Sequence, residues 1–216
     1  MSGTAADLIR HAESEIGYRE GMRNSNKFAA DVLHANNQPW CATFLAAMAK
    51  RAGVPLPSTS PYTPSMFRGF VNAGQAFGRA ETPLPGDFVF FDFPDTVRRI
   101  QHVGLVIGVP STGTLWTVEG NTSPGDGGSQ VNGGGVYPRV RPVRYVVGYG
   151  RPPYKREKDS SMTETPSYKA KSRVQSFVPV IIKDVVVGYY VVTVDGEIFG
   201  FGAAPYFGRV DTTEIP

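Results

Sequence analysis

The chain has 216 residues, of which 41% are hydrophobic, so it is long enough to fold around one core of about 150 residues plus an appendage. A net charge of +3 is too small to indicate a nucleic-acid partner, and no run of about 18 apolar residues predicts a transmembrane span. One cysteine excludes a disulfide scaffold. The first residues, MSGTAADLIRHAESEIG, include acids and lack an apolar core, so we expect no secretory signal.

Three helices are predicted in the first quarter of the chain. Residues 4–18 show apolar positions three to four apart, with Thr4 as a possible N-cap, and residues 26–36 predict a shorter helix. Residues 41–53, CATFLAAMAKRAG, predict a third helix that is apolar almost all round and stops at Gly53. The only cysteine, Cys41, therefore lies at or within one turn of a helix N-terminus.

Strand patterns replace the helical ones after residue 84. Short runs rich in Val and aromatic residues are separated by Gly, Pro and Ser, and they cover residues 86–93, 102–109, 114–121, 134–140 and 144–152. An antiparallel sheet that follows a helical half is an α+β order. We predict a catalytic domain over residues 1–154, a polar linker over 155–172 and a small β-rich segment over 173–216, with a hairpin turn at Asp195-Gly196.

Cys41 and one of the three histidines form a candidate reacting pair. A cysteine is a useful nucleophile only as thiolate, and a helix N-terminus or a nearby imidazole can stabilise that form. His11 and His34 fall in the N-terminal helices among polar residues, whereas His102 opens the apolar run HVGLVIGV. A titratable residue at the start of a buried strand is a candidate general base.

Glu119 and Asn121 are candidate partners for that base. They are two residues apart in the strand pattern VEGN, so both side chains are expected on one face, where either is able to orient the imidazole. Gln38, three residues before Cys41, is a candidate oxyanion donor beside the Cys41 backbone N–H. Trp40 is a candidate substrate-binding residue, although an aromatic at this position is more often part of the core.

Each of these residues also has a purely structural interpretation. A single buried cysteine is most often an inert small hydrophobe. Glu119 fits a solvated strand end, and Asn121 fits an Asx turn before Ser123-Pro124. A catalytic site is favoured because a nucleophile, a base and an orienting group occur together in one chain, in that order.

The runs PWCATFLAAMAKRAGVPLP, LPGDFVFFDF, HVGLVIGV, TVEGNTS and GGGVYPRVR together resemble the CHAP family of cysteine, histidine-dependent amidohydrolases/peptidases. The resemblance covers roughly residues 5–154 and is nearest to versions in phage endolysins. It implies a papain-like α+β fold, with Cys41 as nucleophile, His102 as base, and Glu119 or Asn121 as the orienting residue. Many members have Gln directly before the cysteine, where this chain has Trp40, and no acidic calcium-binding cluster is evident. No metal or other cofactor is implied.

The C-terminal run VGYYVVTVDGEIFGFGAAPYFG resembles one copy of a repeat of actinobacterial surface proteins. It is interpreted as a wall-binding module, an oligomerisation element or a remnant, and the oligomeric state is not predicted.

The sequence thus predicts a peptidoglycan hydrolase that cleaves an amide in or next to the stem peptide through a thioester acyl-enzyme, acting on Gram-positive or actinobacterial walls. The alternatives are a non-catalytic wall-binding or tail-assembly module and a peptidyl or acyl transferase that uses the same thioester. Without a secretory signal, the expected location is the host cytoplasm with holin-dependent release, or the virion.

Overall fold

The computed structural model describes residues 3–93, 99–111, 113–124, 129–130 and 132–155, together with the strand backbone of residues 174–182, 185–193 and 198–202. Contacts between Cα atoms divide the chain into two compact units, Met1–Arg156 and Glu157–Pro216. The predicted linker, residues 155–172, lies outside the described residues apart from Lys155.

Two of the three predicted helices form much as expected. Helix α1 (Ala5–Glu13) begins at the predicted N-cap, where the Thr4 hydroxyl accepts from the Asp7 N–H and the Asp7 carboxylate accepts from the Thr4 N–H. Helix α3 (Cys41–Arg51) is buried from its first residue to Ala49 and ends before Gly53, whose φ of 67° is in the left-handed region.

The second predicted helix is much shorter than residues 26–36. Helix α2 (Phe28–Asp31) is one turn long, because the backbone leaves helical geometry at Val32 and Leu33 adopts a φ of 57°. Two elements that the sequence did not predict follow α3, namely helix α4 (Thr63–Asn72) and strand β1 (Ala76–Gly78). Single turns of 3-10 helix occur as η1 (Met22–Asn24) and η2 (Val143–Tyr145).

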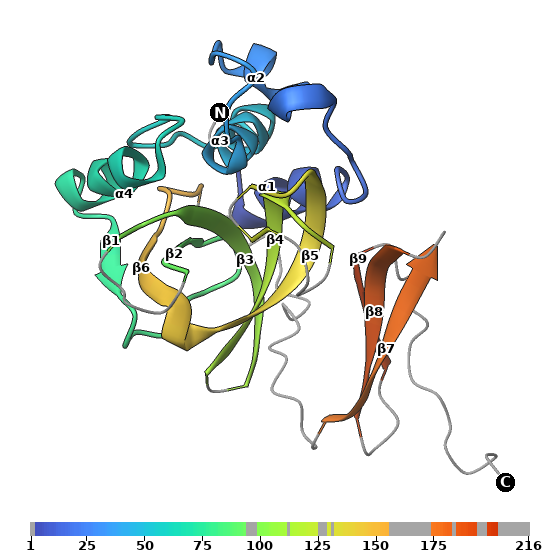
Figure 1. The fold of residues 1–216 in the computed structure, drawn as a ribbon. Helices are drawn as coiled ribbons and strands as arrows, with labels where there is room; N and C mark the ends of the chain where they lie inside the picture. The colour runs from blue at the N-terminus through green and yellow to red at the C-terminus, as the bar shows by residue number, and fades with distance from the viewer. Residues whose placement is uncertain are drawn as a thin grey trace, which may run out of the picture. The chain divides into compact units, whose positions relative to one another are not determined.

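All five strands predicted in the first unit are present. They are β2 (Phe88–Phe91), β3 (His102–Ser111), β4 (Thr114–Thr122), β5 (Gly135–Pro142) and β6 (Val146–Gly150). With β1 they form one sheet in the order β1-β6-β2-β3-β4-β5, in which each neighbouring pair is antiparallel (Figure 1). The predicted α+β fold, with helices packed on an antiparallel sheet, is confirmed.

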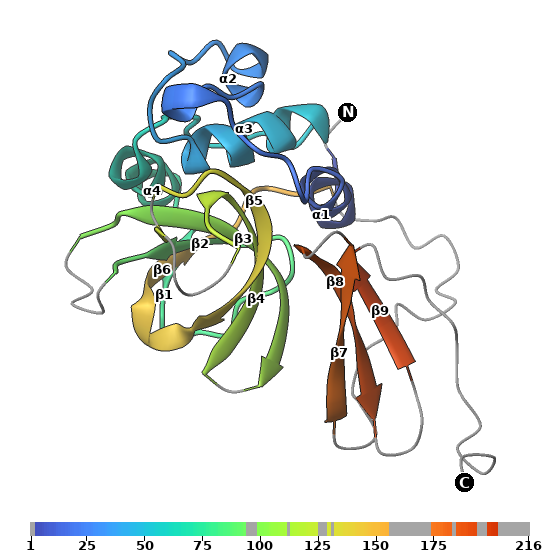
Figure 2. The same ribbon diagram turned by 45° about the vertical axis from the view of Figure 1, so that its right-hand side comes forward.

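The two faces of this sheet have different surroundings. Helices α1, α3 and α4 lie on one side of the strongly curved sheet (Figure 2), and α3 packs there against residues such as Val103, Leu105 and Val118. The other face has its own apolar cluster, which includes Val106 and Leu115. Because side chains alternate along a strand, His102 and Glu119 belong to this second face.

The second unit contains a three-stranded antiparallel sheet in the order β7-β8-β9. Its strands are β7 (Val174–Ile182), β8 (Val185–Thr193) and β9 (Ile198–Gly202). The predicted hairpin corresponds to β8 and β9, and β7 adds a strand that the hairpin prediction lacked. The predicted turn at Asp195-Gly196 lies outside the described residues. Among the helices that are described, none has the length and apolar character needed to cross a membrane.

Candidate active site

Cys41 is the first residue of α3 and lies at the floor of an open pocket. The pocket has a volume of about 390 Å³, and its lining consists of Pro39, Cys41, Pro61, Tyr62, Thr63, Arg99, Ile100, Gln101 and Asn132. The cysteine is only 3% exposed. Within the described residues, no side chain caps the N-terminus of α3, so its first N–H groups remain available to a negatively charged group in the pocket.

His102, the first residue of β3, is fully buried beside this cysteine. Its Nε2 lies 2.9 Å from Oε2 of Glu119, and the ring of Phe91 stacks at 6.3 Å between centroids. Within the described part of the chain, Nδ1 has no hydrogen-bond partner. Since Nε2 is occupied by Glu119, Nδ1 is the ring nitrogen left to exchange a proton with the thiol.

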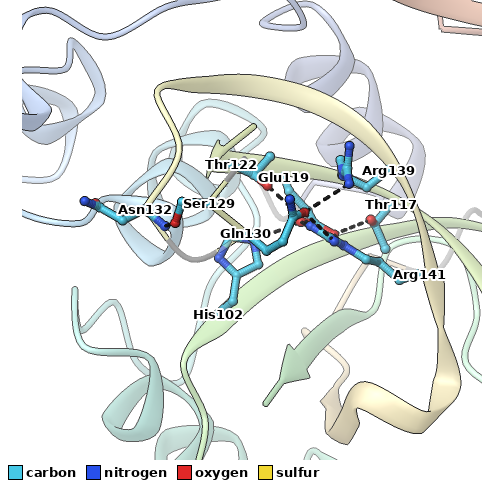
Figure 3. Close-up of polar contacts among 9 residues, drawn as sticks. All are labelled: His102, Thr117, Glu119, Thr122, Ser129, Gln130, Asn132, Arg139 and Arg141. Carbon is cyan, nitrogen blue, oxygen red and sulfur yellow. Dashed lines mark hydrogen bonds and ion pairs between the residues drawn. The ribbon is translucent and has the colours of Figure 1, made fainter. Parts of the chain in front are cut away.

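Four donors saturate the carboxylate of Glu119 (Figure 3). Oε1 accepts from the Thr117 hydroxyl at 2.6 Å and from Nε of Arg141 at 2.8 Å. Oε2 accepts from Nη2 of Arg141 and from His102. An ionised carboxylate has about four lone-pair positions and only accepts. This geometry therefore fits an anionic Glu119 and places the hydrogen of His102 on Nε2.

The charges of the site follow from these neighbours. Burial disfavours the imidazolium form of His102, but Cys41 and Glu119 favour it more strongly and raise its pKa to about 9. Burial likewise disfavours the Glu119 carboxylate, but Arg141 and then His102 hold its pKa well below the usual range. At neutral pH the site therefore holds a cationic His102 next to an anionic Glu119.

Two glycines allow these side chains to come together. A Cβ on Gly104 would lie 2.8 Å from Cγ of Glu119, so the absent side chain gives the glutamate its path toward His102. A Cβ on Gly120 would lie 2.7 Å from Cβ of Phe44 and 2.8 Å from the ring of Trp40. Gly120 therefore lets the first turn of α3, which includes Cys41, pack directly on β4.

The other predicted site residues flank Cys41 and Glu119 and make contacts of their own. Asn121 adopts a φ of 57° where the register between β4 and β5 shifts, and its Nδ2 donates to Oδ1 of Asn132 at 3.4 Å. The Nε2–H of His102 donates to Glu119. The amide of Gln38 donates to the Ala35 carbonyl at 3.0 Å. Trp40 is fully buried among aromatic rings, and its indole N–H donates to Glu20.

Several polar residues around the site were not predicted. They are Thr117, Gln130, Asn132, Arg139 and Arg141, of which Thr117 and the two arginines are buried. Asn132 lines the pocket beside Cys41, and Oε1 of Gln130 accepts from both arginines. The signal for the arginines was their spacing of two in YPRVRP, which places both on the same face of a strand. Across the described residues, no group of three or more His, Cys, Asp or Glu side chains is placed to hold a metal ion.

The fold and the site thus define an α+β domain. It carries a cysteine on a helix, a histidine on a strand and a buried carboxylate. The CHAP domain family model matches residues 33–121, which include Cys41, His102 and Glu119. The resemblance to this family is confirmed over that range.

Three solved structures are similar to this chain at low identity. An NlpC/P60 family protein from Bacillus cereus ATCC 10987 is 14% identical with a TM-score of 0.43, over 70% of this chain and 41% of that one. The P60 domain of antigen MAP1204 from M. avium subspecies paratuberculosis is 16% identical with a TM-score of 0.40, over 68% and 93%. The endolysin LysIME-EF1 is 14% identical with a TM-score of 0.41, over 93% and 79%. The match thus spans less than half of the Bacillus protein, and no curated protein matches the chain.

Proposed function

We propose that the first unit is a cysteine-dependent amidase or endopeptidase that cleaves an amide in or next to the stem peptide of peptidoglycan. The observation behind this proposal is the placement of Cys41 at a helix N-terminus, on the floor of an open pocket and beside a buried histidine held by a carboxylate. The match to the CHAP domain model supports peptidoglycan as the substrate.

The reaction begins with Cys41 as thiolate and His102 as imidazolium. Sγ attacks the amide carbonyl, and the N–H groups at the start of α3 stabilise the oxyanion of the tetrahedral intermediate. His102 then gives its Nδ1 proton to the leaving amine as the C–N bond breaks, which leaves a thioester on Cys41. The neutral imidazole next takes a proton from water, the hydroxide attacks the thioester, and Cys41 departs as thiolate beside the regenerated imidazolium.

The rim of the pocket offers apolar and polar groups to a peptide substrate. The exposed ring of Tyr62 forms an apolar wall, and Asn132 carries an amide that is able to bond a peptide backbone. Arg99 adds a positive charge at the same rim, which suits a substrate rich in carboxylates, as stem peptides are.

Mass spectrometry of peptidoglycan fragments tests this function. Purified walls from Gram-positive and actinobacterial species are incubated with wild type, Cys41→Ala and His102→Asn. A matched control is His11→Asn, which makes the same change in α1. We expect new fragments from wild type and the control only, and the new termini identify the bond that is cut.

Three results would contradict the proposal. Fragments from Cys41→Ala would show that this cysteine is not the nucleophile. No fragments from any variant across several wall types would favour the non-catalytic binding module. New amide bonds to an added amine in place of free carboxyl termini would identify a transferase.

A further inference from the structure

Arg141 makes more polar contacts than the reaction chemistry alone requires. It is 4% exposed on β5, and its Nε and Nη2 grip both oxygens of Glu119. Its Nη1 donates to Oε1 of Gln130 at 2.7 Å, and Nη2 also lies 3.3 Å from the Thr122 hydroxyl. The guanidinium lies 5.0 Å from the centroid of the Phe93 ring. Its orientation is therefore fixed from several sides.

We propose that Arg141 is a positioning residue for the reacting pair, because its two-pronged grip fixes the Glu119 carboxylate so that Oε2 holds Nε2–H of His102 and leaves Nδ1 for Cys41. Among the described residues, the hydrogen bonds of Arg141 go to Glu119, Gln130 and Thr122, so it acts on the reacting pair through Glu119. The inference rests on the proposed role of Cys41 and His102 as the reacting pair, and it does not depend on the identity of the substrate.

During the reaction cycle Arg141 keeps the Glu119 carboxylate ionised, in addition to fixing its position. In the resting site, Glu119 has two cationic neighbours, His102 and Arg141. Once His102 passes its proton to the leaving amine, Arg141 is, among the described residues, the cation that still pairs with the buried carboxylate. Without it, burial would drive Glu119 to take up a proton, and a protonated carboxyl no longer has both oxygens free to accept from Thr117 and His102.

The groups that set the charge of this site are few in the described structure. The titratable groups that act on His102 are Cys41 from α3 and Glu119 from β4, and those that act on Glu119 are Arg141 from β5 and His102 from β3. Strand β2 contributes the ring of Phe91, which does not titrate. A change at Arg141 should therefore alter the reactivity of Cys41 by acting first on Glu119 and then on His102.

Alkylation of the full chain by iodoacetamide tests the inference without any peptidoglycan. Cys41 is the only cysteine, so the rate of mass increase reports on this thiol alone. Rates are measured from about pH 5 to about pH 10 for wild type, Arg141→Met, Glu119→Gln, the double variant and Arg141→Lys. Arg144→Met is a matched control, because Arg144 packs over Tyr145 on η2.

We expect Arg141→Met and Glu119→Gln each to slow alkylation about tenfold slightly below neutral pH, because loss of the anionic carboxylate weakens the imidazolium that stabilises the reactive thiolate. The double variant should be no slower than either single variant, because both changes disable the same carboxylate. Arg141→Lys, which keeps the charge and loses the fork, should fall between wild type and Arg141→Met.

The inference would be overturned if Cys41 in Arg141→Met were alkylated at the wild-type rate across the whole pH range. Losses that multiply in the double variant would also overturn it, because they would mean that Arg141 acts independently of Glu119. If circular dichroism shows that Arg141→Met does not fold, Arg141→Lys decides the question, and a pH profile identical to wild type would overturn the inference. A slow wild-type reaction at neutral pH would instead contradict the reacting pair itself.

Discussion

At Glu119, two oxygens receive four hydrogen bonds and have no lone pair left for a proton. This arrangement determines how the residues of the site respond to pH, because the charge of His102 depends on Glu119 on one side and on Cys41 on the other. The acidic and alkaline limits of the site are therefore set by different groups.

Activity should fall as the pH rises through about 9, where His102 loses the proton that the leaving amine needs. In Glu119→Gln this alkaline limb should move to lower pH, because a neutral amide no longer contributes to the raised pKa of His102. The measurement is kcat/KM for fragment release as a function of pH. Glu81→Gln, at an exposed position, is the control, and an alkaline limb that stays in place in Glu119→Gln would contradict the assignment.

Glu119→Gln should also destabilise the fold, by about 3 kcal/mol at neutral pH, because it leaves the buried Arg141 without its counter-charge. The pKa of Glu119 is lowered by folding, so its stabilisation is complete above the ordinary value of about 4.5 and declines as the pH falls below it. The loss should thus be smaller near pH 3 than near pH 7. Urea unfolding at both pH values measures it, and equal losses would mean that charge is not the cause.

The sequence pointed to Cys41, His102 and Glu119 but not to the arginines behind them. In PRVRP, Val140 lies between Arg139 and Arg141, a pattern that normally places the valine inside and the arginines in solvent. In the structure Val140 is 57% exposed, while Arg139 is 6% and Arg141 4% exposed. The reversal occurs because the inner face of β5 meets a carboxylate on β4, and this partner is not visible in the pattern of a single strand.

Helix α3, which begins at Cys41, packs on strand β4, which carries Glu119. Gly120 sets the distance between them, because a Cβ at this position would clash with Phe44 and Trp40. The position of Cys41 depends on this contact between α3 and β4.

Gly120→Ala should cost about 2 kcal/mol of stability and reduce activity, because α3 must move away from β4 to admit the added Cβ. Gly78→Ala is the matched control, since Gly78 lies in a strand with nothing within 4 Å of its added Cβ. That variant should change stability by less than about 0.5 kcal/mol. Thermal unfolding and fragment release measure both effects, and a Gly120→Ala protein as stable as the control would refute the close-packing argument.

Helices and strands with a continuous apolar pattern could be predicted from the sequence. The helix that contains proline and glycine could not. The uninterrupted apolar run of α3 and the Val-rich strands were confirmed. Helix α4 was missed because Pro64 and Gly69 read as loop residues. Pro64 is tolerated because it lies in the first turn, and a Cβ on Gly69 would meet Cβ of Ser58 at 2.3 Å, so the glycine serves packing.

At the scale of the whole molecule, the apolar clusters that are described lie within residues 8–154. The end of this unit is fastened by Arg151, which pairs with the buried Asp87, and by Tyr154, whose hydroxyl donates to the Gly86 carbonyl. The first unit therefore has a core and a closed C-terminal end of its own. The predicted division near residue 154 remains a prediction that truncation can test.

A chain that ends at residue 155 should fold, with a melting temperature within a few degrees of the full chain, because about 150 residues suffice for an independent core. It should release fragments from soluble peptidoglycan at the same rate. If the C-terminal segment is the wall-binding module, the truncated chain should lose sedimentation with intact walls, and full sedimentation would exclude that role. Calorimetry and a pelleting assay separate the two outcomes.

The solitary thiol at the base of the pocket has a consequence for the durability of the protein. A nucleophilic thiolate is also the group that peroxides oxidise first, and the resulting sulfenic acid is normally rescued by a second thiol nearby. This chain has no second cysteine, so it cannot form a protective intrachain disulfide. Oxidation at Cys41 should therefore proceed to the irreversible sulfinic acid unless an external thiol intervenes, and the working lifetime of the protein should depend on the reductants around it.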